Sequence, residues 1–169
     1  MHRNDINNQL GPAIEAQLAE LSNANHCGAG SIVKAVERSE LRARIASVDR
    51  LACECELLTV TDPRLGSQTT DGLQALADRL SEQLSYLEER LIVLEVDRVA
   101  SQVQLRSQEP RVTAEVRSYF EVQVGKLAVT LQRFEKEPGR QRQSVPATLT
   151  RDLFCRVCTD LIASLHELA

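Results

Sequence analysis

Aromatic residues are nearly absent from this chain. Phe, Tyr and Trp together make up 3% of its 169 residues, and there is no Trp. The hydrophobic residues, 43% of the total, are therefore mostly aliphatic, which predicts a core of Leu, Val, Ile and Ala. Proteins that bind bases or sugars usually stack them on aromatic rings, so the composition disfavours such ligands.

The chain also lacks an excess of positive charge. It carries 20 Lys and Arg against 24 Asp and Glu, a formal net charge of −4. Because binding to a nucleic-acid backbone depends on a basic surface, nucleic acid is not an expected partner.

Long apolar segments are missing as well. No run approaches the length of about 20 residues that spans a bilayer, and the polar start of the chain lacks the apolar stretch of a secretory signal. These absences predict a soluble cytoplasmic protein that does not enter a membrane. The five cysteines, an odd number, are then expected to be reduced thiols, mostly small core residues.

Residues 1–60 are predicted to form an N-terminal extension that begins with a helix. Ile14, Leu18 and Leu21 recur at helical spacing after a Pro that suits a first helical turn. Between residues 31 and 60 the apolar spacing fits either a helical stripe or two alternating strands. We favour a helix to about Arg38 and then a hairpin that turns at 47–50. The polar composition of residues 61–70 predicts a linker.

Residues 71–169 are predicted to form a helix–meander–helix unit, or one continuous domain with residues 1–60. Leucines at helical spacing predict a helix over 71–88, capped by Asp71 with Gln74. A last helix is expected over 150–168, with Thr150 as its N-cap.

Residues 91–135 alternate between apolar and polar side chains, which is typical of strands with one solvated face. Four such strands predict an antiparallel meander. Gly125-Lys126 fits a two-residue turn. That turn would pair Val124 with Leu127 and Phe120 with Leu131.

The predicted fold class is α+β: a four-stranded antiparallel sheet with helices 71–88 and 150–168 packed on one face, plus an N-terminal helical or helix-hairpin extension.

Cysteine offers one possible chemistry. Cys155 and Cys158 form a CxxC pair inside the last helix, and Cys53 with Cys55 would share one face of a strand. Zinc held by these four thiols is conceivable, but packed core thiols are the favoured interpretation. His26-Cys27 lies in a Gly- and Asn-rich break and is interpreted as a loop, because neighbouring side chains seldom face each other as a catalytic pair needs.

A basic loop offers a second possibility. Arg133, Lys136, Arg140 and Arg142 surround a Pro/Gly segment and could bind an anion or a carboxylate-rich partner, although a solvated loop is the favoured interpretation. The sequence contains no nucleotide fingerprint, phosphate loop or hydrolase motif. It therefore implies no catalytic residue, metal site or cofactor.

These observations favour a non-enzymatic protein-binding module that binds a partner or self-associates, such as a small dimeric adaptor or chaperone. In size and charge the chain is similar to small acidic α/β secretion chaperones, an analogy at the level of class. The alternatives are an anion- or nucleic-acid-binding domain that uses the 133–142 loop, and a zinc or thiol protein.

Overall fold

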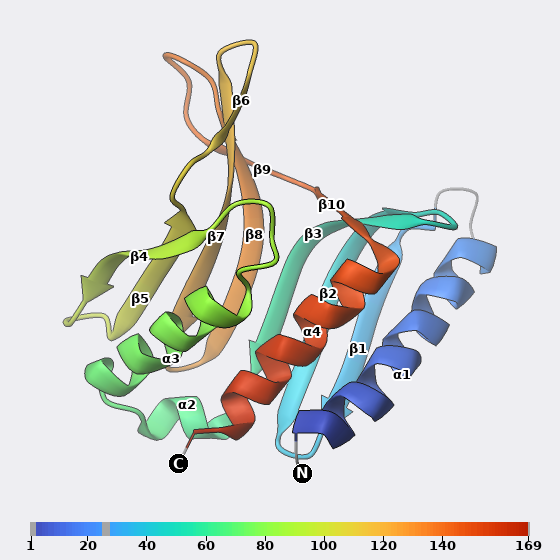
Figure 1. Cartoon of the computed structure of the whole chain (residues 1–169), viewed down its shortest axis with the longest axis horizontal. Coiled ribbons are helices and arrows are strands. Elements are labelled where there is room, and N and C mark those ends of the chain that lie inside the picture. The colour runs from blue at the N-terminus through green and yellow to red at the C-terminus, as the bar shows by residue number, and fades with distance from the viewer. Residues whose placement is uncertain (1–2, 25–27, 169) are drawn as a thin grey trace.

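The structure is a computed structural model that describes residues 3–24 and 28–168. Its strands form one antiparallel sheet, and its three longer helices lie side by side on one face of that sheet (Figure 1). In chain order the elements are α1 (Arg3–Ala24), β1 (Gly30–Val36), β2 (Ser39–Val48), β3 (Ala52–Thr61), α2 (Pro63–Ser67), α3 (Thr70–Gln83), β4 (Leu91–Asp97), β5 (Gln102–Ser107), β6 (Arg111–Thr113), β7 (Val116–Gly125), β8 (Ala128–Lys136), β9 (Gln143–Val145), β10 (Ala147–Thr150) and α4 (Arg151–His166).

The sheet has ten strands, so the predicted four-stranded sheet is wrong, although the α+β class is confirmed. Seven strands follow the order β1-β2-β3-β8-β7-β5-β4, while β6 pairs with β7, β9 with β8 and β10 with β3. The predicted meander is present as β4, β5, β7 and β8. The prediction failed because the N-terminal residues supply β1, β2 and β3 to the same sheet, and the short strands β6, β9 and β10 also join it.

Residues 30–36 form a strand, not the predicted helix. The hairpin with β2 turns at Glu37, whose φ of 53° is in the left-handed region, and it pairs Val36 with Ser39. The pairing with β2 outweighs the helix propensity of the residues near Lys34, because local propensity is weak compared with tertiary contacts. The hairpin alternative for the following residues is the one observed, as β2 and β3.

The β7–β8 hairpin differs from its predicted register by two residues. The structure pairs Val124 with Val129 and Phe120 with Arg133, so the loop is Lys126-Leu127. Leu127, expected on the apolar face, is consequently 86% exposed. A register shift of two residues leaves the remaining side chains of both strands on their predicted faces of the sheet. The alternating pattern therefore could not distinguish the two registers.

The core lies between the sheet and the helix layer. Ile6, Leu10, Ile14 and Leu18 recur on one side of α1, and all four are buried. Helix α4 sits between α1 and α3 and contacts both, so its residues 157–165 are all buried. Among the described residues, no helix is both long and apolar enough to cross a bilayer.

The helices begin at side-chain caps. Thr150 precedes α4 as predicted, and its Oγ1 accepts a hydrogen bond of 3.2 Å from the backbone N–H of Leu153. The predicted Asp71 cap of α3 is wrong, because Thr69 takes that position and accepts from Gly72. The predicted linker 61–70 contains the short helix α2.

Candidate functional site

The far end of the β7–β8 hairpin extends beyond the helix layer (Figure 1). Strand β8 pairs with β3 only at residues 128–131; farther along, β3 pairs instead with β10. Residues 143–150, here called the strap, cross from β8 to β3 at this divergence. The side chains that face the helix layer here therefore line a cleft instead of being covered by a helix.

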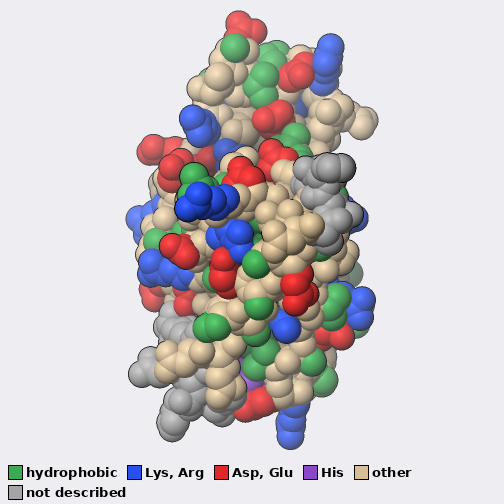
Figure 2. Space-filling view, turned by 90° about the vertical axis from the view of Figure 1, so that its right-hand side faces the viewer, with side chains coloured by type: hydrophobic (Ala, Val, Ile, Leu, Met, Phe, Trp, Pro, Cys, Tyr) green, Lys and Arg blue, Asp and Glu red, His purple; other side chains and the backbone are tan. Residues whose placement is uncertain are grey.

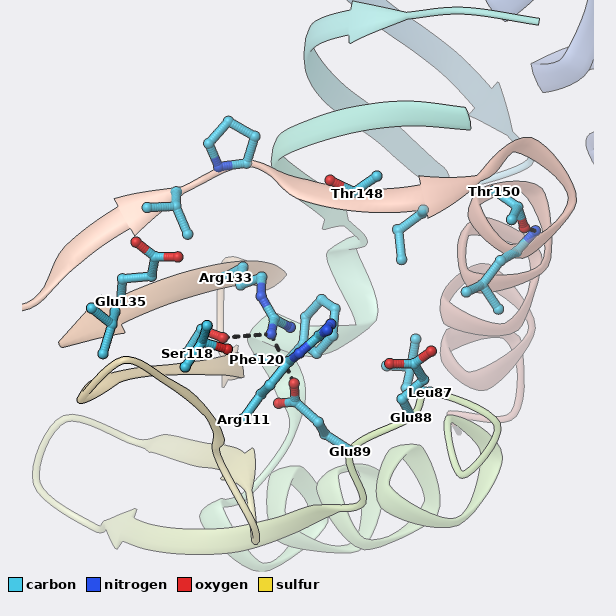
Figure 3. A pocket seen from close by; sticks show the side chains of 16 residues that line it. Leu87, Glu88, Glu89, Arg111, Ser118, Phe120, Arg133, Glu135, Thr148 and Thr150 are labelled. Carbon is cyan, nitrogen blue, oxygen red and sulfur yellow. Dashed lines mark hydrogen bonds and ion pairs between the residues drawn. The ribbon is translucent and has the colours of Figure 1, made fainter. Parts of the chain in front are cut away.

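The cleft has a volume of about 730 Å³. Strands β7 and β8, the strap, the start of α4 and the loop between α3 and β4 surround it (Figure 3). Its apolar wall includes Leu87, Val116, Phe120, Val145, Pro146, Leu149 and Leu153. Its charged lining is Arg111 and Arg133 against Glu88, Glu89 and Glu135.

Arg133 crosses the cleft from β8. One of its guanidinium nitrogens, Nη2, donates to Glu89 Oε1 and to Ser118 Oγ, each at 2.8 Å (Figure 3). The guanidinium carbon lies 4.7 Å from the centre of the Phe120 ring, which adds a cation–π contact. With 15% of its side chain exposed, Arg133 is held in one position by three neighbours.

Glu89 leaves part of this arrangement incomplete. It lies in the loop after α3, is 9% exposed and points into the cleft toward Arg133 (Figure 3). Its second oxygen, Oε2, is buried and accepts no hydrogen bond from any described residue. Because a buried carboxylate oxygen without a donor is unfavourable, a ligand donor that Glu89 turns to meet would stabilise the pair.

The lining combines apolar side chains with charged groups. No His or Cys occurs among the described residues that line the cleft, so a hydroxyl such as that of Ser118 has no imidazole beside it as a base. Ser118 itself accepts the hydrogen bond from Arg133. The arrangement is suited to recognition: apolar walls with a fixed ion pair at the centre.

The four basic residues suggested by the sequence do not form one cluster. Arg133 lines the cleft, whereas Lys136 and Arg142 line a hollow on the opposite, helix-free side of the sheet. Arg140 lies in the loop and pairs with Glu137 at 2.9 Å. The separation follows from alternation along β8, because residues 133 and 136 point to opposite faces.

The sequence did not suggest Glu89, Ser118 or Arg111 as cleft residues. Glu89 and Ser118 meet Arg133 only through long-range packing, and no local spacing predicts that. On the opposite face the alternation of Arg117 with Tyr119 is visible in the sequence, but the pairing of Arg117 with Lys136 follows only from the observed register.

The four described cysteines gather where α4 covers β3. Burial is the main cause that raises the pKa of Cys53, Cys55 and Cys155 to about 12, and the pKa of Cys158 is also well above its usual value. The thiols are therefore protonated at neutral pH. No group of three or more His, Cys, Asp or Glu in the described part of the chain has an arrangement that could hold a metal ion, so the zinc alternative gains no support. His26-Cys27 lies outside the described residues.

The end of the molecule formed by α1 and β1 has a smaller hollow of about 440 Å³, lined by Gln9, Leu10, Ala13 and residues 34–37. Figure 2 shows acidic and basic side chains interspersed there with small apolar patches. Comparison of the chain with protein-family models, curated proteins and solved structures finds no match.

Proposed function

We propose that the chain is a non-enzymatic protein-binding module whose cleft receives a segment of a partner protein. The observation that carries the proposal is the buried Arg133–Glu89 pair between apolar walls, in which one carboxylate oxygen has no hydrogen-bond donor among the described residues. An apolar side chain could fill the space beside Phe120, while a neighbouring N–H or ammonium group donates to Glu89.

The fixed position of Arg133 supports binding with little change in that side chain. Phe120, Ser118 and Glu89 already hold the Arg133 side chain, so little rotamer freedom is lost when a ligand arrives. The unpaired thiols of Cys53, Cys55, Cys155 and Cys158 support a cytoplasmic setting as part of this proposal.

The proposal is tested by selecting random displayed peptides on the full chain and measuring the enriched peptides by fluorescence anisotropy. The test variant is Thr148→Arg, because Thr148 is exposed and lines the cleft, so the larger side chain blocks the cleft without disturbing the core. We expect enriched sequences that combine an apolar residue with a hydrogen-bond donor. Their affinity should fall at least about tenfold in Thr148→Arg.

A matched control adds the same charge elsewhere. Val33→Arg changes a side chain on β1 that is 42% exposed and far from the cleft, and it should bind the peptides like the wild type. Circular dichroism of both variants verifies the fold. Absence of any enriched peptide, or equal affinity in Thr148→Arg, would contradict the proposal.

A further inference from the structure

The helix-free face of the sheet carries a concentration of positive charge around one hollow. Strands β5, β7 and β8 and the loop before β9 enclose about 810 Å³ there. This basic hollow is lined by Arg106, Arg117, Lys136 and Arg142, together with Gln104, Pro110, Tyr119 and Gln141. Its lining includes no carboxylate, although the whole chain has a net charge of −4.

Two of the arginines are fixed on aromatic rings. Tyr119 and Phe134 stack with ring centres 6.0 Å apart. The guanidinium carbon of Arg106 lies 4.6 Å from the Tyr119 ring centre, and that of Arg142 lies 4.4 Å from the Phe134 ring centre. The scarce aromatic residues of this chain thus hold cations in place, and these contacts stabilise the cluster.

A single buried carboxylate lies beneath these arginines. Glu121 is 3% exposed and its Oε2 accepts hydrogen bonds from both Arg106, at 3.2 Å, and Arg142. Although burial alone would raise its pKa, hydrogen bonds from Arg142 and Gln123 lower it, so Glu121 is ionised at neutral pH. The arginines are therefore already arranged around one carboxylate.

Further donors in the basic hollow are left for a second anion. The side chain of Arg117, which is exposed, forms no ion pair or hydrogen bond with another described residue. Lys136 pairs with Arg117 across the β7–β8 ladder and donates to the carbonyl of Arg140. Four cations thus face one internal carboxylate, an excess of three positive charges.

The nearby acidic side chains reduce this excess only in part. Glu115 and Glu137 line a neighbouring hollow with Arg117 and Lys136, and Glu137 is paired with Arg140 at 2.9 Å. Charge of this density attracts and orients an anionic ligand.

We propose that the basic hollow is a binding site for oxyanions, in which phosphate or clustered carboxylate groups contact Arg117, Lys136 and Arg106. Guanidinium groups bind both kinds of anion through paired N–H donors. Nucleic acid is disfavoured, because base stacking needs an open ring, whereas Tyr119 is 6% exposed and lies under Arg106.

The site is tested by calorimetric titration with inorganic tripolyphosphate and with a hexaglutamate peptide, at low and high ionic strength. The test variant is the double substitution Arg117→Gln and Lys136→Gln. Both side chains are exposed and neither holds Glu121, so the sheet should remain intact. We expect affinity to fall at least about tenfold in the variant and to weaken with salt in the wild type.

The matched control removes the same charge from the same face. Arg42 and Arg44 lie on β2, with side chains 63% and 59% exposed, and Arg42→Gln with Arg44→Gln should change affinity less than about twofold. Thr148→Arg should also leave it unchanged, because the cleft is on the other face. The proposal for the cleft and the proposal for the basic hollow can therefore be contradicted independently.

The titrations also identify the source of the anion. Binding of tripolyphosphate alone supports a free phosphate compound as ligand, and binding of hexaglutamate as well supports an acidic segment of a protein. The proposal is overturned if neither anion binds, if both double variants lose equal affinity, or if oligothymidylate binds more tightly than either anion.

Discussion

Asp62 is a buried carboxylate at the junction of β3 and α2, with 3% of its surface exposed. It accepts hydrogen bonds from Ser39 Oγ, from the backbone N–H of Arg64 at 2.8 Å, and from the Arg64 guanidinium at 2.7 and 2.9 Å. Arg64 also donates to the carbonyl of His166 at 3.3 Å. One carboxylate thus connects β2, α2 and the end of α4.

These contacts make stability depend on pH. Burial alone would raise the pKa of Asp62, but the hydrogen bonds from Arg64 and Ser39 outweigh it and lower the pKa to about 2, from 3.8. Because the folded pKa is the lower one, the stabilisation is complete above about pH 4 and is lost as the pH falls towards 2. We expect Asp62→Asn to lower the free energy of unfolding by about 2 kcal/mol at pH 7.

Urea unfolding of wild type and Asp62→Asn at pH 7 and pH 3 measures this difference. The difference in free energy of unfolding between the two proteins should be smaller at pH 3 than at pH 7. Glu95→Gln, at an exposed position on β4, is the control and should change little. An unchanged midpoint for Asp62→Asn at pH 7 would show that the carboxylate is not stabilising.

The buried thiols give a second prediction at the residue scale. With pKa values near 12, Cys53, Cys55 and Cys155 contain little thiolate at pH 8, and reaction with a disulfide reagent should be roughly a thousandfold slower than for a thiol of pKa 9. The measurement uses a Cys27→Ser background, so that only the described thiols report. All should react quickly in denaturant, and rapid reaction of the folded protein would refute their protonated state.

Strands and helices were recovered from the sequence where the pattern was local. Alternation over 91–135 predicted β4, β5, β7 and β8, and apolar spacing together with Thr150 predicted α4. The register of β7 against β8 was predicted wrongly, because a shift of two residues keeps Val122 and Leu131 on the apolar face. That shift is what places Arg133 opposite Phe120, so the centre of the cleft could not be predicted either.

The cap of α4 allows a test at the scale of an element. Removing the Thr150 hydroxyl leaves the N–H of Leu153 without its partner. Thr150→Ala should lower the free energy of unfolding by about 1 kcal/mol, whereas Thr150→Ser, which keeps the hydroxyl, should have a much smaller effect. Thermal and urea unfolding of the two variants measure this. Equal loss in both would assign the effect to the lost methyl group instead.

At the scale of the whole molecule, two parts of the sheet meet where β3 pairs with β8, and the strap joins them again farther along. Neither contact has a local signature, since β3 and β8 carry ordinary alternating patterns and the strap resembles a polar loop. The predicted four-stranded sheet was wrong for this reason. The cleft exists only because these two parts diverge, so its position depends on the complete sheet.

The pairing of β3 with β8 also affects how fast the chain folds. Residues 58–61 must find residues 128–131, which closes a loop of about 70 residues before any contact between them compensates for the lost entropy. The β1–β3 ribbon and the β4–β8 meander can each form earlier from near neighbours. Until they join, the edges of β3 and β8 are exposed to other chains. Folding in milliseconds to seconds, with aggregation as its main competitor, is the expected consequence.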